Sequence, residues 1–447
     1  MAYQTTTTTS YGTRVGNSFK AIGTGFIMFL AGTVLLWWNE GNFVKTQKML
    51  EEAQGNAVHV ESVAKIDPSN EGQLIHATDK AITQDSLVDQ TFGVGVVGVR
   101  LQSNVEYYQW VEHQKEEKRD KLGGGEETIT TYTYSKEWVN QPVSSSSFAD
   151  PEYKNIDNNV LMTVEEERLY AKEVKFGAYM LSENLIHGIG ATQDLDVNAT
   201  DERLAQIDKQ LTAHMGGKKN QVNQAQQAPI ANDSVAQDAP VEVKEVKDYE
   251  MLHVQGNQIY IGKVFNGNNV GDVRIKFQYV PNNLTVSLIA KVQGNTFVKY
   301  VAKNGRQFDR IEVGNKSMEE MFQSANDENS MMTWILRIVG ILLVIGGLKG
   351  IFGILTTLLK VIPFLASIMN FGVGLICSVV GFAWSLIIIA LAWLFYRPVI
   401  GIIIIAIAGA AVYFFAFKGK SKPAVEPAPA PAPAPEQPKM PDLPNQQ

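Results

Sequence analysis

Hydrophobic residues gather in four long stretches of this 447-residue chain, and the rest of the chain is polar. The four stretches cover residues 21–38, 331–348, 364–396 and 398–417. A helix needs roughly 20 apolar residues to cross the hydrocarbon core of a bilayer, with about 17 as a lower limit. The pattern therefore predicts four transmembrane helices, one near the N-terminus and three near the C-terminus, and it excludes a purely soluble protein.

The polar region between the first and second predicted spans, residues 39–330, carries strand patterns. Within 272–280, apolar residues alternate with charged and polar ones, which is typical of a half-buried strand. Pro281-Asn282-Asn283 predicts a turn, and residues 284–292 predict the strand that pairs with the first. This region is therefore expected to be rich in β-structure.

A second hairpin is predicted over 94–114 and 126–140, with the charged segment 115–121 as part of its loop. Trp110 and Trp138 are expected to pack against each other across this hairpin. The predicted fold class is an α+β membrane protein. Its large β-rich extramembrane domain is inserted between the first and second transmembrane helices.

The β-rich domain is close to the largest size that one hydrophobic core serves, so we expect two subdomains, 56–198 and 249–315. Between them, residues 204–215 have the spacing of a short amphipathic helix. Residues 216–247 are rich in Gln, Asn, Ala and Lys and show no periodicity, which predicts a mobile insertion.

Two segments near the second span have patterns of their own. Ser317 and Glu320 fit a capping box for a helix that leads into this span. Residues 349–363 predict an amphipathic helix in the membrane interface, and a re-entrant piece packed on the helix bundle fits them equally well. On a helix, the small and polar residues of this segment form one stripe: Gly353, Thr356, Thr357 and Lys360.

The two ends of the chain are predicted to be tails. Residues 1–20 form an N-terminal tail, in which the run Thr5–Thr9 is expected to lack regular structure. Nine of the 17 prolines follow residue 422, many in Pro-Ala alternation, so 418–447 is predicted to be an extended, disordered tail.

Basic residues near the spans predict the orientation, because Lys and Arg are more frequent on the cytoplasmic side. If both termini are cytoplasmic, seven basic residues lie on that side: Arg14, Lys20, Lys349, Lys360, Lys418, Lys420 and Lys422. Four lie on the other side: Lys45, Lys48, Arg337 and Arg397. Arg337 falls inside the second span, and we expect its side chain to extend outward to the interface. Residues 39–330 are then periplasmic or luminal.

The composition limits which partners and which kinds of chemical site the chain can have. Residues 331–417 contain four charged side chains and no acid, so the rest of the chain has 46 acidic against 35 basic residues. An acidic polar part repels phosphate, which argues against nucleic acid as a partner. Cys377 is the only cysteine, and the six histidines are at least 17 residues apart. We find no metal-ligand spacing and no catalytic or nucleotide-binding motif, so no catalytic, cofactor or metal site is predicted.

Seven short motifs, spread over about residues 16–417, resemble the transmembrane protein 43 family, also called LUMA. In chain order they are Asn39–Gly41, Asn70–His76, Val105–Glu112, Tyr132–Trp138, Val270–Arg274, Thr333–Arg337 and Trp393–Pro398. They include two Asn-Glu-Gly blocks, a Val-Glu-Tyr-Tyr-Gln-Trp-Val-Glu string and an Arg-Pro pair before the last span. The candidate interaction or structural residues within them are Asn39, Glu40, Gly41, Asn70, Glu71, Gly72, Glu106, Gln109, Trp110, Glu112, Trp138, Gly271, Asp272, Arg274, Trp334, Arg337, Tyr396, Arg397 and Pro398. One departure is Tyr153-Lys154-Asn155-Ile156, where the family tends to have His-x-Asn-Pro.

The resemblance implies four spans, a large luminal-side domain and a role in organising membrane protein complexes through self-association. It implies no catalytic residues. Animal members reside in the endoplasmic reticulum and inner nuclear membrane, whereas the Pro-Ala tail and the preceding lysines suit a bacterial member with a periplasmic domain in the inner membrane. The expected partners are the lipid bilayer, further copies of the chain and other membrane proteins.

The predicted function is a non-enzymatic membrane scaffold that self-associates and organises membrane protein complexes or membrane structure. Two alternatives remain open at this point. One is a channel or transporter subunit, and the other is a membrane-anchored sensor whose external domain binds a ligand.

Overall fold

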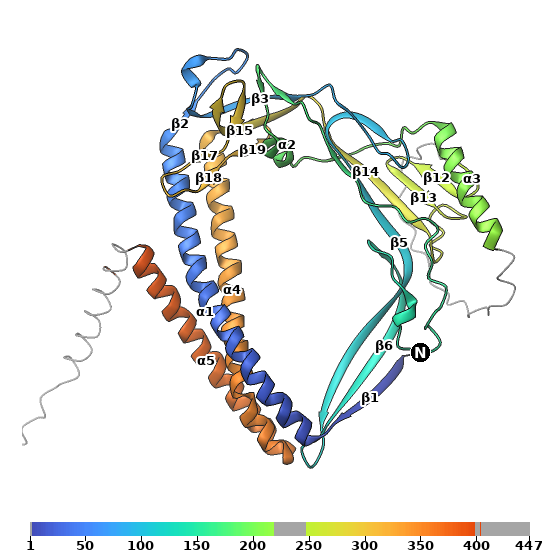
Figure 1. The fold of residues 1–447 in the computed structure, drawn as a ribbon, viewed down its shortest axis with the longest axis vertical. Coiled ribbons are helices and arrows are strands. Elements are labelled where there is room, and N and C mark those ends of the chain that lie inside the picture. The colour runs from blue at the N-terminus through green and yellow to red at the C-terminus, as the bar shows by residue number, and fades with distance from the viewer. Residues whose placement is uncertain (1, 219–246, 398–402, 404–447) are drawn as a thin grey trace, which may run out of the picture. The chain divides into compact units, whose positions relative to one another are not determined.

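The computed structural model describes residues 2–218, 247–397 and 403. The chain divides into two compact units, Met1–Ala392 and Trp393–Gln447. The first unit contains two large β-sheets and the long helices α1, Tyr11–Asn56, and α4, Met318–Leu358 (Figure 1). Helix α5, Pro363–Tyr396, begins in the first unit and ends in the second.

Three helices of the described chain are long and apolar enough to cross a membrane: Tyr11–Asn56, Met318–Val361 and Ile368–Tyr396. They contain the first three predicted spans, and the chain is therefore an integral membrane protein with a β-rich domain between the first and second of them. The fourth predicted span, 398–417, lies outside the described residues except for residue 403. The tail 418–447 and most of the insertion 216–247 also lie outside them.

Helices α1 and α4 pack closely because small residues face each other. A Cβ atom on Gly25 would lie 2.7 Å from the carbonyl oxygen of Gly347, and one on Gly347 would lie 2.5 Å from the backbone nitrogen of Phe29. Glycines at such positions allow two backbones to approach and to pack by van der Waals contact. The capping box predicted for the start of α4 is present, since the Ser317 hydroxyl accepts from Glu320 N and the Glu320 carboxylate accepts from Ser317 N.

The separate interfacial helix predicted over 349–363 is not formed. Helix α4 continues without a break to Leu358 and is followed by one short 3-10 turn, Leu359–Val361. The polar stripe faces protein rather than lipid headgroups, because Thr357 accepts a 2.8 Å hydrogen bond from Ser18 of α1. Lys360 lies 3.4 Å from Asp120 of the β-domain. The protein contacts of this stripe explain why its amphipathic pattern does not indicate an interfacial helix.

The first sheet contains ten strands, seven of which follow the order β1-β6-β5-β14-β13-β12-β11. The ten are β1 (Tyr3–Thr9), β4 (Ser86–Val88), β5 (Gly95–Asp120), β6 (Glu126–Val139), β7 (Arg168–Tyr170), β10 (Gln193–Asp194), β11 (Lys247–Asp248), β12 (Leu252–Gln255), β13 (Gln258–Ile261) and β14 (Val273–Pro281). Helix α3, Asp201–Lys218, contributes Leu204, Ile207 and Leu211 to the core of this sheet. This is the amphipathic helix predicted over 204–215.

The second sheet contains seven strands in the order β19-β15-β16-β9-β8-β3-β2, with an additional pairing between β15 and β3. They are β2 (Ala57–His59), β3 (Leu74–Ile82), β8 (Lys175–Phe176), β9 (Tyr179–Met180), β15 (Leu284–Gln293), β16 (Thr296–Val298) and β19 (Arg310–Val313). The short helix α2 (Glu183–Gly188) packs on this sheet, and β17 (Tyr300–Val301) pairs with β18 (Gln307–Phe308). Leu50 of α1 and Phe322 of α4 share a core with Phe308, which joins the helices to the β-domain.

The predicted pairing of 272–280 with 284–292 is wrong. The two strands exist as β14 and β15, but β14 pairs with β5 and β15 pairs with β3. Asn283, with φ of 62°, turns the chain from one sheet into the other. The two sequential subdomains are wrong for the same reason, because each sheet takes strands from both halves of the domain. Local alternation indicates a strand but does not identify its partner.

The hairpin of β5 and β6 is longer than predicted. Its strands pair without interruption from Tyr107 opposite Val139 to Asp120 opposite Glu126, so the charged segment 115–121 is almost entirely strand. Strand β1 pairs with the outer side of β6, and the Thr run is therefore ordered rather than irregular. Threonine is β-branched and favours extended backbone, and β6 offers the edge that this segment needs.

Candidate functional site

The motif residues near the membrane meet at a buried ion pair between α1 and α4. Arg337 Nε lies 2.5 Å from Glu40 Oε1, and Arg337 Nη2 lies 2.8 Å from Glu40 Oε2. The Glu40 side chain is fully buried, and the Arg337 side chain is 11% exposed. The Arg337 side chain, which was expected to extend toward the interface, is thus bound by a carboxylate of α1. A bidentate geometry of this kind is the strongest form of an Arg–carboxylate contact, and it compensates for the loss of water around both charges.

The neighbours of this pair belong to the same two motifs. Asn39 donates a 3.0 Å hydrogen bond from Nδ2 to the backbone oxygen of Thr333, and the ring of Trp334 lies 4.8 Å from the Arg337 guanidinium carbon. Asn39 and Gly41 are both buried within α1. Within the described chain, the Asn39 side-chain oxygen is buried without a hydrogen-bond partner. The first and sixth motifs thus form a single junction that holds α1 against α4.

A second cluster forms where β5, β6 and β14 run side by side. Arg274 Nε lies 2.5 Å from Glu106 Oε2, and its guanidinium carbon lies 4.2 Å from the centre of the Trp138 ring. Tyr108 packs on Trp138 with ring centres 5.2 Å apart. The hydrogen bond from Arg274 lowers the pKa of Glu106 from its ordinary value. Three motifs from different parts of the chain therefore meet at Trp138.

The Gly271-Asp272 turn leads into β14 and closes onto the same cluster. Gly271 has φ of 98°, and a Cβ atom there would lie 2.5 Å from the backbone oxygen of Asn159, so only glycine fits. The backbone nitrogen of Gly271 donates to Tyr108 O, and Tyr108 N donates to Asp272 O. The buried Asp272 carboxylate accepts a 2.5 Å hydrogen bond from the Tyr260 hydroxyl. Burial raises the pKa of Asp272.

The remaining motif residues of the hairpin fasten the loop that follows it. Gln109, which is 1% exposed, uses its side-chain amide to bind the backbone of Val143. Glu112 accepts a 2.5 Å hydrogen bond from the Tyr134 hydroxyl, and the Tyr134 ring stacks on Tyr153 with centres 4.1 Å apart. Tyr153 thus has a packing role at the position where the sequence departs from the family pattern.

Trp110 and Trp138 do not pack against each other as predicted. Trp110 stands opposite Lys136, whose ammonium lies 4.9 Å from the centre of the Trp110 ring, whereas Trp138 stands opposite Tyr108. The pairing register decides these neighbours. A shift of two residues between the strands separates side chains that the sequence alone places near each other.

The other two motifs lie apart from these clusters. Gly72 has φ of 77°, its nitrogen donates to Val292 O, and the Glu71 carboxylate accepts from Gly294 N. The segment Asn70-Glu71-Gly72 thereby supports the turn between β15 and β16. At the end of α5, Arg397 lies over the Trp393 ring at 5.5 Å, while Tyr396 packs on Phe395. Pro398 lies outside the described residues.

Two histidines that the sequence did not predict to be neighbours lie side by side on β2 and β3. His59 Nδ1 lies 2.9 Å from His76 Nδ1, and His76 Nε2 lies 2.9 Å from Lys316 O, beside a cavity of about 580 Å³. Burial lowers the pKa of His76. The two histidines are 17 residues apart and become neighbours because β2 and β3 pair in parallel. Among the described residues, no group of three or more His, Cys, Asp or Glu side chains is placed to hold a metal ion.

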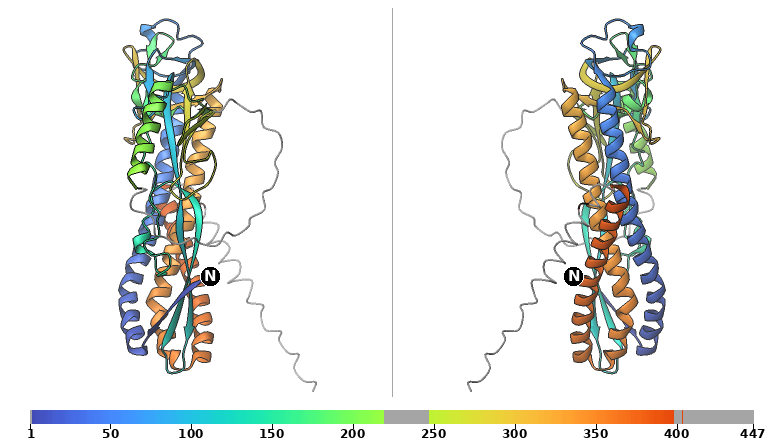
Figure 2. Two further views of the ribbon diagram at one scale, coloured as in Figure 1. Left: turned by 90° about the vertical axis from the view of Figure 1, so that its right-hand side faces the viewer. Right: turned by 90° about the vertical axis from the view of Figure 1, so that its left-hand side faces the viewer.

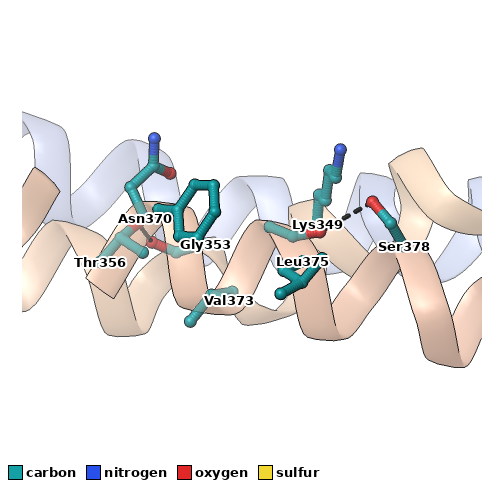
Figure 3. A pocket seen from close by; sticks show the side chains of 9 residues that line it. Lys349, Gly353, Thr356, Asn370, Val373, Leu375 and Ser378 are labelled. Carbon is teal, nitrogen blue, oxygen red and sulfur yellow. Dashed lines mark hydrogen bonds between the residues drawn. The ribbon is translucent and has the colours of Figure 1, made fainter. Parts of the chain in front are cut away.

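A further cavity, of about 450 Å³, lies between α4 and α5. Lys349, Thr356, Asn370 and Ser378 line it, together with apolar residues (Figure 3). In Figure 3 the Lys349 and Asn370 side chains extend in the same direction, and the Ser378 hydroxyl donates to Gly374 O at 2.7 Å. The cavity provides polar groups inside an otherwise apolar part of the chain.

Comparison with known proteins gives one consistent result. The family model described as transmembrane protein 43 matches residues 107–398. Transmembrane protein 43 of Rattus norvegicus is 27% identical over 396 residues, which cover 86% of each chain. The human protein is 27% identical over 402 residues, covering 88% of each. The Drosophila melanogaster homolog is 26% identical over 388 residues, covering 84% of this chain and 89% of its own. No solved structure is significantly similar to this chain.

Proposed function

Because this chain belongs to the transmembrane protein 43 family, we propose that it is a non-enzymatic membrane scaffold that self-associates and organises other membrane proteins or the membrane itself. In this proposal both termini are cytoplasmic, and the cores of the two sheets lie on the periplasmic or luminal side. The bacterial inner membrane is the proposed compartment.

The observation that carries the proposal is the use of the motif residues inside the fold. Five of the seven motifs meet in two clusters, one joining α1 to α4 and one joining β5, β6 and β14. Their charged groups are engaged with one another: Glu40 with Arg337 and Glu106 with Arg274. The first cluster holds the two helices together and the second holds three strands of the domain together, and such internal rigidity is what a scaffold requires. Two long helices that share one core with that domain provide a rigid connection.

Self-association is tested by expressing two full-length copies with different tags in the same cell. Purification through one tag is expected to recover the second, and native mass measurement in mild detergent is expected to show a defined oligomer. Copies mixed only after solubilisation serve as the control for exchange. Recovery of monomer alone, without a co-purifying membrane protein, would contradict the scaffold.

The cavity between α4 and α5 supports a second candidate, a channel or transporter subunit. Lys349 and Asn370 are the polar side chains that a solute path through this part of the bundle would use. Reconstituted liposomes would then show a flux that Asn370→Leu reduces. An equal flux through wild type, variant and empty liposomes would remove this candidate.

A further inference from the structure

The distal half of the β5–β6 hairpin reaches the ends of α1 and α4 that lie furthest from the sheet cores. We call this element the arm: β1, residues 111–120 of β5 and residues 126–135 of β6. The arm tip and the N-terminal end of α1 lie at the same level in Figures 1 and 2. Gly123 N donates to Val361 O just after α4, so the tip contacts both helices.

Arg14 of α1 fixes this contact. Its guanidinium binds Asp120 at 2.7 Å and Glu126 at 3.0 Å, and it also donates to the backbone oxygens of Gly124 and Gly125. Arg14 is only 7% exposed. Lys360 adds a second positive charge, with its Nζ 3.4 Å from Asp120 Oδ1. A buried Arg with four partners on the tip positions the arm firmly.

The arm is long enough to pass the depth of the membrane spans. From Arg14 to Glu40, α1 extends about 39 Å at a rise of about 1.5 Å per residue. The ten arm residues of β5 extend about 33 Å at about 3.3 Å per residue. A bilayer's hydrocarbon core is about 30 Å thick. With Arg14 near one membrane face and Glu40 near the other, an arm of this length is long enough to cross the same depth.

The composition of the arm does not suit lipid. Residues 113–120 of β5 are exposed and include Lys115, Lys118 and Arg119. A Lys or Arg facing lipid in a membrane strand costs about 2–4 kcal/mol at the bilayer midplane and about 0–1 kcal/mol near the interfaces. Of these three residues, Lys115 lies furthest from the tip, about 16 Å at about 3.3 Å per residue, and it therefore carries the largest cost. Beside the Arg14 contacts, a cavity of about 540 Å³ lies between the arm and the helix ends, and its lining includes Thr7, Glu116, Lys118, Thr128 and Ser18. The arm thus requires water or protein around it.

The arm has two open edges in the described chain. Beyond Tyr107, β5 pairs only with β6, because β14 ends its pairing there, and β1 pairs only with β6. Unpaired strand edges are not tolerated in the hydrocarbon region, and they are normally covered or paired. The described residues of one copy leave both edges without a neighbouring strand.

The two edges match each other in direction, length and level. Strands β1 and β5 both run toward the tip, since each is antiparallel to β6. Thr9 and Asp120 both pair with Glu126, and Tyr3 and Gln114 both pair with Tyr132. Residues 114–120 of β5 are therefore level with the whole of β1. Strand β1 carries no charge, so it places no like charge opposite the charged β5 strand.

We propose that the partner of this arm is a second copy of the chain, whose β1 pairs in parallel with the distal part of β5. Repeated around a ring, this head-to-tail contact closes the arms into a polar β-wall with water on its inner side and the helices on its outer side. The inference rests on the proposed self-association and specifies its contact.

Cysteine cross-linking of the full-length protein tests this pairing. Thr5 and Glu116 both lie level with Thr130, so Thr5→Cys and Glu116→Cys are introduced together into a Cys377→Ala background. Within one copy, β6 separates the two positions by about 9.6 Å. This exceeds the roughly 7 Å limit for a disulfide, so a bond between them joins two copies. Oxidation in membranes is expected to give a ladder of covalent oligomers.

Gln114→Cys and Lys118→Cys replace Glu116→Cys in parallel tests, so that a stagger of two residues is also detected. The control joins Thr5→Cys with Glu183→Cys, because the Glu183 side chain is 86% exposed and lies on α2. An equal ladder in the control would overturn the pairing as non-specific. A native oligomer without cross-links at any of the three positions would overturn the pairing and leave the scaffold standing. A native monomer would overturn both.

Discussion

Arg337 of α4 holds the carboxylate of Glu40 on α1 with two hydrogen bonds, across 297 residues of sequence. Each residue lies at or within a predicted span, and neither charge is stable there alone. Together they join α1 to α4 inside both helices, 16 residues before α1 ends at Asn56. The pair also explains why an Arg is tolerated in the second span.

Removing one member of this pair is expected to destabilise the protein more than removing both. Glu40→Met removes the carboxylate that binds the buried guanidinium, at a cost of about 3–5 kcal/mol. The double variant Glu40→Met with Arg337→Met removes both charges and should recover most of the loss. Thermal unfolding of the full-length protein in detergent measures the difference. Equal losses in the single and double variants would contradict a paired role.

The glycine contact between α1 and α4 predicts a sharp positional effect. Gly25→Ala places a methyl group 2.7 Å from Gly347 O and is expected to cost about 1–3 kcal/mol, as overpacking generally does. Gly23 is two residues away, and a methyl group added to it would have no neighbouring atom within 4 Å, so Gly23→Ala is the matched control. Thermal unfolding compares the two variants. The contact is contradicted if the control loses as much stability as Gly25→Ala.

The Glu106–Arg274 pair predicts a pH dependence. Because the pKa of Glu106 is lowered in the folded protein, its stabilisation is present above the ordinary value of 4.5 and is lost as the pH falls through the folded pKa. Glu106→Gln should therefore unfold at a lower temperature than wild type near neutral pH, and the two should converge below pH 4.5. The exposed Glu152→Gln is the control. A difference that stays constant through the acid range would exclude this cause.

The stack of Tyr134 on Tyr153 predicts how firmly the loop 143–158 is held. Tyr153→Ala removes the stacked ring and its contact with Trp110, and aromatic pairs contribute about 0.5–1.5 kcal/mol beyond their buried area. Limited proteolysis should then cut this loop faster. Tyr153→Phe keeps the ring and should behave as wild type. If both variants resist proteolysis equally, the stack does not secure the loop.

The Arg14 contacts predict that the arm tip loosens when they are removed. Arg14→Gln should increase amide hydrogen exchange across 117–128, because Asp120 and Glu126 lose their buried partner. Arg119→Gln serves as the control, since that side chain is 58% exposed and pairs only with Glu117 among the described residues. Unchanged exchange in Arg14→Gln would show that β-pairing alone holds the tip.

The sequence predicted the type of most elements because local patterns report which side of an element is buried. The apolar stretches predicted three helices that the structure confirms as long and apolar enough to cross a membrane, and alternation predicted the strands β5, β6, β14 and β15. The capping box at Ser317 and the amphipathic helix α3 were also correct. Each of these depends on residues a few positions apart.

The candidate residues were identified from the sequence as short motifs. Which of these residues lie next to each other in the fold was not predicted. Nothing near Arg337 in sequence indicates Glu40, and nothing near His59 indicates His76 except a strand register. The stripe of 349–363 had the amphipathicity of an interfacial helix, and only its contacts with Ser18 and Asp120 show that it faces protein. A polar face has the same pattern whether water, headgroups or protein cover it.

The sequence by itself determined that this chain is a membrane protein with a β-rich domain between its first two spans. Composition and periodicity fix that result, because the free energy of burying each segment depends mainly on its own residues. Only the tertiary structure decided that β14 and β15 enter different sheets, that the Thr run pairs with β6, and that the arm meets Arg14. These outcomes depend on which distant segments come into register, since backbone hydrogen bonds are equally available to many partners.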